Sequence, residues 1–177
     1  LYEVDGKEVI DPYAAALSDR NVWGKRNKQR QSRGQIRLEE FDWDGDCLLR
    51  LPFSESVLYQ LHVRGYTKHV SSGVQHRGTF AGVQEKIPYL KELGINAVEL
   101  MPVFEFDEME STRVVDGERL YNYWGYNTVC FFAPNTSYTS VVEHNHEGDE
   151  LKELIYELKE NGIEVILDVV FNHTAEG

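Results

Sequence analysis

Apolar and polar residues follow two different periods along most of the chain. Runs rich in β-forming residues predict strands at 57–64, 96–102 and 163–170. Between them, apolar residues recur at spacings of three and four over 83–93 and 151–158, which predicts two amphipathic helices. Strand, helix, strand, helix and strand in this order predict βαβ units with a parallel sheet.

Glycine, proline and capping residues mark where these elements end. Pro88 lies inside the first helical pattern, so we expect that helix to kink or restart there, with Gly94 as its C-terminal cap. Asp149 is in a good N-cap position for the second helix, which Gly162 helps to end. The intervening residues 103–147 are predicted to form a long loop.

The third predicted strand is almost continuously apolar, which is typical of a strand covered on both faces of a sheet. An open doubly wound sheet and a (β/α)₈ barrel both fit this pattern. No Gly-x-Gly-x-x-Gly follows the first strand, which weakens the dinucleotide-binding interpretation, and no P-loop pattern occurs. Residues 1–55 are rich in turns and are interpreted as the end of a β domain and its linker.

Composition narrows the possible partners. Hydrophobic residues make up 41% of the 177 residues and the formal net charge is −12, a profile typical of soluble globular proteins. An acidic chain argues against nucleic acid as the main partner, and the short basic stretch at 25–37 is interpreted as a solvated loop. No apolar run approaches the ~20 residues that cross a bilayer, so no membrane partner is expected.

The cysteines and the first residues of the chain indicate which cellular compartment to expect. Cys47 and Cys130 occur in strand-like surroundings and are interpreted as small buried hydrophobes. The chain has no initiator Met and its first residues lack the basic and apolar regions of a signal peptide. We therefore expect a piece of a longer protein, with a cytoplasmic location as the default.

Polar residues interrupt the end of the third predicted strand. Asp168 lies within the apolar run, and a buried carboxylate is costly unless it is paired. Asp168 and Asn172 share one face of a strand, and His173 follows directly. In a barrel, such residues at the carboxyl end of a strand line the active site. A carboxylate that merely tethers a neighbouring loop is the alternative.

Five segments of the chain resemble one enzyme family. Asp168-Val-Val-Phe-Asn172-His173 resembles the Asp-x-x-x-Asn-His signature on the third barrel strand of family 13 glycoside hydrolases, the α-amylase superfamily. The other segments resemble the second-strand segment, the aromatic loop that follows it, the first strand of the isoamylase and glycogen-debranching branch, and the exit from the preceding β-sandwich. These segments are 94–102, 121–127, 59–67 and 9–16, respectively.

The resemblance implies a fold and a domain division. It implies an α/β protein with an incomplete (β/α)₈ TIM barrel, of which residues 56–177 form the first three βα units. Residues 1–55 would then be the end of an N-terminal, carbohydrate-binding-like β-sandwich and its linker. The remaining half of the barrel is expected to come from the same parent chain.

The resemblance also implies roles for individual residues. Tyr126 is similar to a tyrosine that stacks on the sugar at the cleavage point, and His173 to a histidine that hydrogen-bonds that sugar. Asp168 is similar to an aspartate that holds the catalytic arginine. Asn172 and Trp124 are expected to support this substrate-binding site. No cofactor and no metal are assigned, although calcium is possible in the parent protein.

Two polar clusters have simpler interpretations than a metal site. His144-Asn-His146 with nearby acids fits some metal motifs, but a solvated turn and helix cap is favoured. The acidic residues at 107–110 are interpreted as a solvated loop. His62 and Arg64 are expected to pack under the site, without a readable function.

The implied function is hydrolysis of α-1,6 branch linkages in glycogen or a related α-glucan by a retaining mechanism. Retaining hydrolysis needs two carboxylates about 5–5.5 Å apart. In the family these residues come from later strands, so we expect no catalytic residue in this chain and no activity from it alone. Pullulanase, α-amylase, branching enzyme and a noncatalytic carbohydrate-binding module are the alternatives.

Overall fold

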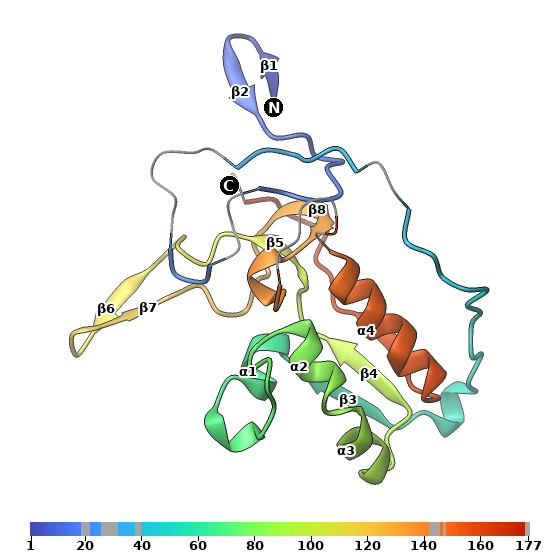
Figure 1. Ribbon diagram of the computed structural model, residues 1–177. Coiled ribbons are helices and arrows are strands. Elements are labelled where there is room, and N and C mark those ends of the chain that lie inside the picture. The colour runs from blue at the N-terminus through green and yellow to red at the C-terminus, as the bar shows by residue number, and fades with distance from the viewer. Residues whose placement is uncertain (19–21, 26–31, 38–39, 142–145, 147, 176–177) are drawn as a thin grey trace.

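The computed structural model describes residues 1–18, 22–25, 32–37, 40–141, 146 and 148–175. Its centre is a parallel sheet in the order β3-β4-β9 (Figure 1). The strands are β3 (Leu58–Leu61), β4 (Ala97–Leu100) and β9 (Glu164–Leu167). The parallel pairing of these strands confirms the predicted βαβ units.

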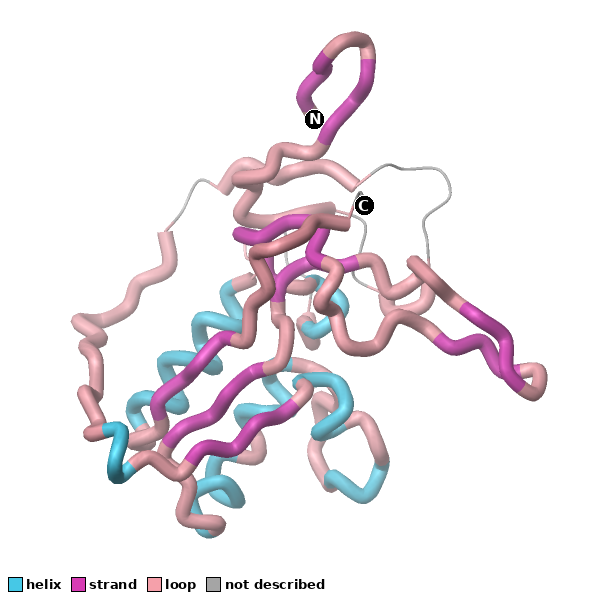
Figure 2. Tube along the Cα trace, turned by 180° about the vertical axis from the view of Figure 1, so that it is seen from behind, coloured by secondary structure: helices cyan, strands magenta, loops and turns pink. Residues whose placement is uncertain are grey.

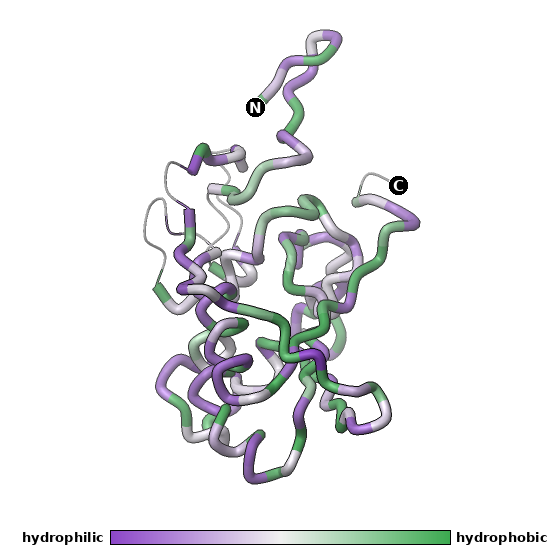
Figure 3. The backbone as a smooth tube through the Cα atoms, turned by 90° about the vertical axis from the view of Figure 1, so that its right-hand side faces the viewer, coloured by the Kyte–Doolittle hydropathy of each residue, from purple (hydrophilic) through white to green (hydrophobic). Residues whose placement is uncertain are grey.

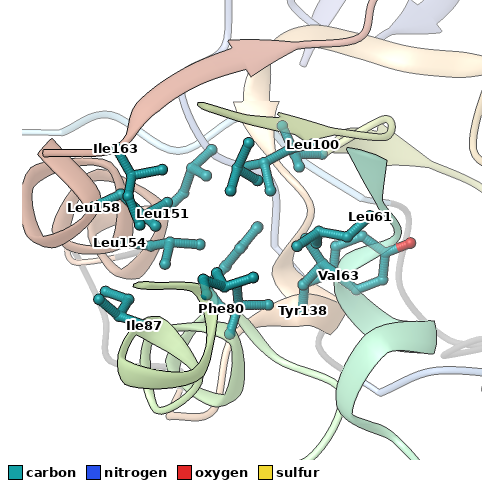
Figure 4. Close-up of a cluster of buried hydrophobic side chains, with 14 of the residues drawn as sticks. Leu61, Val63, Phe80, Ile87, Leu100, Tyr138, Leu151, Leu154, Leu158 and Ile163 are labelled. Carbon is teal, nitrogen blue, oxygen red and sulfur yellow. The ribbon is translucent and has the colours of Figure 1, made fainter. Parts of the chain in front are cut away.

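Helices cover one face of this sheet (Figure 2). Phe80, Leu154 and Leu158 are fully buried between the helices and the sheet (Figure 4), and fully buried Leu90 belongs to the same hydrophobic core. The apolar stripes predicted from helical spacing therefore face the core. The helices are α1 (Val63–Thr67), α2 (Phe80–Gln84), α3 (Ile87–Glu92) and α4 (Asp149–Glu160).

The helix boundaries confirm two predictions and correct two. The first helical pattern is split as expected, because α3 restarts with Pro88 in its first turn, and Gly94 ends it at a φ of 81°. The first strand is shorter than predicted, since it ends at Leu61 and His62 already caps α1. Asp149 is not an N-cap, because Gly148 occupies that position with a left-handed φ.

The predicted long loop over 103–147 contains four strands, so that prediction was wrong. β5 (Phe104–Phe106) pairs antiparallel with β8 (Thr128–Pro134), and β6 (Arg113–Val115) pairs with β7 (Glu118–Leu120) in a projecting hairpin (Figure 1). The hairpin turns at an Asp-Gly pair with positive φ at both residues, the geometry that matches strand twist.

Buried Glu105 fixes the segment that follows β8. Its carboxylate accepts hydrogen bonds from the backbone N–H of Thr136, at 2.7 Å, and from the Thr136 hydroxyl, at 2.6 Å. These bonds hold a short 3₁₀ helix at Thr136–Tyr138. Tyr138 is thereby placed in the core beside Phe80 (Figure 4), and its ring also contacts that of Phe106.

The third strand is less covered than predicted. β9 ends at Leu167, lies at the edge of the sheet, and leaves Ile166 46% exposed. The apolar stretch continues past β9 towards the C-terminus (Figure 3), where Phe171 is 75% exposed. Its apolar character therefore does not correspond to burial on both faces within this chain.

The described residues of the segment 1–55 contain few regular elements. β1 (Tyr2–Val4) and β2 (Lys7–Val9) form a hairpin that extends away from the sheet (Figure 1). The end of a β-sandwich in this segment, and the domain boundary after it, stay predictions. Much of the basic stretch at 25–37 lies outside the described residues.

The cysteines follow their predictions only in part. Cys130 is buried in β8, as predicted. Cys47 is exposed and lies outside any strand, so that prediction was wrong. Its neighbours Asp44 and Gly45 form a turn that interrupts the extended backbone a strand would need.

Candidate functional site

Tyr126 and Asp168 meet at the carboxyl ends of the parallel strands. Asp168 directly follows β9, and its backbone N–H donates to the carbonyl oxygen of Leu100, at the end of β4, at 2.9 Å. The Tyr126 hydroxyl donates to Asp168 Oδ2 at 2.5 Å. Asp168 is thus one residue past the strand and half-buried, rather than in the middle of the strand as predicted.

The hydrogen bond defines the state of the tyrosine. The Asp168 carboxylate that accepts from its hydroxyl raises the pKa of Tyr126 to about 12, with burial adding to the effect. Tyr126 therefore remains a neutral donor at physiological pH. Asp168 holds the hydroxyl end of the Tyr126 ring, and both residues line a small pocket with Pro102 and Phe104.

Asn172 and His173 form a second, exposed pair. The Nδ1 of His173 lies 2.7 Å from the Oδ1 of Asn172, and since an amide oxygen only accepts, the ring N–H is the donor. Within the described residues, no hydrogen bond or ring contact joins this pair to Asp168. The structure thus brings Asp168 to Tyr126, and His173 to Asn172, but does not join all of them directly.

Buried His62 connects the end of β3 to the aromatic loop at 121–127. Its Nδ1 accepts from the Gly65 N–H at 3.0 Å, so its Nε2–H donates to the carbonyl oxygen of Tyr123 at 2.7 Å. The two rings are stacked, with centroids 4.0 Å apart. His62 therefore positions the loop that carries Trp124 and Tyr126. Sequence reasoning expected His62 to pack under the site but left its function open. A polar side chain near the carboxyl end of a predicted strand was the available signal.

His62 should make stability depend on pH. Burial, together with the nearby Arg64 charge, lowers the pKa of His62 below its ordinary value of 6.5. The unfolded state then binds more protons than the folded state just below pH 6.5. We expect the full-length protein to lose stability as the pH falls through this range and the His62→Gln variant to lose less. Thermal unfolding from pH 7.5 to 5 measures this effect, and parallel curves for both proteins would contradict it.

An aromatic cleft lies beside this loop. It has a volume of about 570 Å³ and contains Trp124, which is 55% exposed. The guanidinium carbon of Arg64 lies 4.4 Å from the centre of the Trp23 ring, in a cation–π contact. The cleft is lined by Trp23, Arg64, Ser111, Arg113, Arg119, Leu120, Tyr121, Asn122, Tyr123 and Trp124.

The described residues offer neither a metal centre nor a membrane span. Within them, no group of three or more His, Cys, Asp or Glu side chains is placed to hold a metal ion. In the His-x-His motif, His144 lies outside the described residues. The Nδ1 of His146 lies 3.0 Å from Oδ2 of Asp149. No described helix has both the length and the apolar character to cross a bilayer.

Comparison with models of known protein families shows to which family the chain belongs. The family model for the alpha amylase catalytic domain matches residues 26–177. The chain belongs to the α-amylase family. The β/α arrangement, with Tyr126 and Asp168 at the carboxyl ends of its strands, is therefore an α-amylase-type α/β fold.

Curated relatives of this α-amylase family member include plant and bacterial proteins. The chain is 46% identical to "Isoamylase 1, chloroplastic" of Arabidopsis thaliana over 96% of its own length and 23% of the relative. It is 48% identical to a "Glycogen operon protein GlgX homolog" of Mycobacterium tuberculosis over 77% of its own length and 19% of the relative. The chain thus spans about a quarter or less of these relatives.

Solved structures of similar fold include pullulanases. One is the type I pullulanase of Bacillus subtilis in complex with maltose, with a TM-score of 0.72 and 30% identity over 96% of this chain and 24% of that one. Another is the Paenibacillus barengoltzii pullulanase in complex with maltohexaose and α-cyclodextrin. Its TM-score is 0.74, and it is 27% identical over 94% of this chain and 27% of that one.

Proposed function

We propose that the full-length protein containing this chain hydrolyses α-1,6 branch linkages in glycogen or a related α-glucan, with retention of configuration. Its similarity to isoamylases and GlgX homologues supports a debranching enzyme. Its similarity to pullulanases in complex with maltose and maltohexaose supports an α-glucan as the substrate. We propose a cytoplasmic location as the default, although some relatives are named chloroplastic.

The hydrogen bond between Tyr126 and Asp168 is the observation that carries this proposal. A pyranose presents an apolar face of C–H bonds that can stack on an aromatic ring. Because Asp168 holds the hydroxyl of Tyr126, the orientation of the ring is set before a sugar arrives. We therefore assign Tyr126 to sugar stacking and Asp168 to positioning, including of the arginine that the family resemblance implies.

His173 and Asn172 complete the proposed sugar-binding set. Since Nδ1 of His173 donates to Asn172, the neutral ring presents Nε2 as a hydrogen-bond acceptor for a sugar hydroxyl. Asn172 then orients the ring, while Trp124 contributes an exposed aromatic surface to the same loop as Tyr126. No metal is needed for these contacts, and we propose none.

We propose that the catalytic carboxylates lie elsewhere in the full-length protein. Retention requires a nucleophile on one side of the glycosidic bond and a general acid on the other, about 5–5.5 Å apart. The residues assigned here bind and orient the sugar and do not act as nucleophile or acid. The remaining barrel half is thus the partner on which this chain depends.

Product analysis tests the proposed function. We expect the full-length protein to release unbranched chains from glycogen and to form each new reducing end first as the α-anomer. The isolated 177-residue chain should show no turnover under the same conditions. Chain-length analysis and proton NMR of fresh product measure both features. Release of short oligosaccharides from a linear glucan, or turnover by the isolated chain, would contradict the proposal.

A further inference from the structure

The aromatic cleft is lined by positively charged side chains, although the chain as a whole is acidic. Arg64, Arg113 and Arg119 are among its ten lining residues, and none of the ten is an aspartate or glutamate. The whole chain, by contrast, has a formal net charge of −12. None of these arginines forms an ion pair with another described residue. Three positive side chains that form no ion pair with the described residues are thus gathered in one cleft.

The hydrogen-bonding capacity of these side chains favours an anion. An arginine has five N–H donors and no acceptor, whereas the hydroxyls of a neutral sugar both donate and accept. The only side-chain acceptors in the cleft are the hydroxyls of its serine and tyrosines and the amide of Asn122. A phosphate ester needs donors, and its oxygens match the planar guanidinium fork.

The aromatic side chains add a second requirement. Tyr123 and Trp124 are exposed in the same cleft, and aromatic faces pack against the C–H face of a pyranose. A volume of about 570 Å³ is within the range of small-molecule sites. We propose that this cleft binds a glucosyl unit that carries a phosphate monoester.

The position of the cleft points to a phosphate on the glucan itself. Trp124 precedes Tyr126 by two residues on the same loop, so their Cα atoms are separated by at most about 7 Å. A glucan bound at Tyr126 therefore lies close in the chain to the segment that lines the cleft, and we infer that it extends into the cleft. The inference rests on the proposed function for this choice of glucan, but its binding test does not require hydrolysis.

Calorimetric titration of the full-length protein tests the inference. We expect maltohexaose with one phosphate monoester to bind about tenfold tighter than unmodified maltohexaose at equal ionic strength. The Arg113→Ala/Arg119→Ala variant, changed on the exposed hairpin, should lose this preference. The Arg77→Ala variant removes an exposed arginine outside the cleft and should keep it. Equal affinities in the unmodified protein, or a preference unchanged in the double variant, would overturn the inference.

Competition identifies the source of the phosphate. Weak displacement of the phosphorylated chain by glucose 6-phosphate indicates a phosphoglucan, and displacement at similar concentrations indicates a free sugar phosphate; both support the site. Displacement by inorganic phosphate as strong as by the sugar phosphate would overturn it. Debranching of unphosphorylated glycogen is measured separately. Absence of debranching would contradict the proposed function, whereas the binding preference for the phosphorylated chain is tested by the titration alone.

Discussion

Replacing Asp168 by alanine in the full-length protein should lower kcat/KM for a branched glucan about 100-fold. The substitution removes the acceptor that holds the Tyr126 hydroxyl at 2.5 Å. It also removes the negative charge that the family resemblance pairs with a catalytic arginine. Misplacement of reacting groups by about 1 Å costs a factor of this size. Steady-state kinetics on glycogen, with wild type and variant purified in parallel, measures the effect.

Two further variants separate the functions of this pair. Tyr126→Phe keeps the stacking ring and loses only the hydrogen bond, so we expect a fall of about tenfold. Adding Tyr126→Phe to Asp168→Ala should change little, because the shared hydrogen bond is already lost. Asp168→Asn retains an acceptor oxygen without the charge, so its kcat/KM should lie between those of Tyr126→Phe and Asp168→Ala. Fully multiplicative effects of Tyr126→Phe and Asp168→Ala would contradict a functional pair.

Replacing Gly125 by alanine should destabilise the full-length protein by about 2–5 kcal/mol and also lower its activity. Gly125 has a φ of 81°, and an alanine in this region costs about 1–2 kcal/mol. Its new Cβ would lie 2.6 Å from the buried Phe106 ring, and such overpacking costs about 1–3 kcal/mol more. Since Tyr126 follows directly, relief of this clash would also move the stacking ring. Denaturant unfolding followed by tryptophan fluorescence measures the loss.

Gly117 provides the matched control for this experiment. Its φ is 83°, but a Cβ there would meet no atom within 4 Å. Gly117→Ala should therefore show the backbone cost alone, about 1–2 kcal/mol, with no change of kcat/KM. Equal destabilisation by both substitutions would show that the clash with Phe106 has no effect.

Sequence periodicity predicted the central architecture because local burial decides it. A parallel strand and an amphipathic helix each need apolar residues at fixed intervals, and residues 83–93 and 151–158 show the helical interval clearly. The break just before Pro88 and the stop at Gly94 follow from the geometry of single residues. These features depend on neighbours in sequence, so one chain is enough to read them.

The strands between 103 and 134 were missed for a different reason. β5 and β8 are stabilised by pairing with each other across a long connection, and short segments carry little periodic signal of their own. The Asp116-Gly117 turn was a readable hairpin signal for β6 and β7 that the loop prediction passed over. Pairing between distant segments is the information that local patterns lack.

The sequence alone determined the parallel βαβ core, the family resemblance and the identities of Tyr126, Asp168 and His173 as candidates. Only the tertiary structure joined Tyr126 to Asp168 across 42 positions and showed that His62 donates to the carbonyl oxygen of Tyr123 in the aromatic loop. It also gathered Arg64 with the hairpin arginines in one cleft. Spacing along a chain governs which face a side chain takes, but contacts between distant loops depend on how the packed elements bring them together.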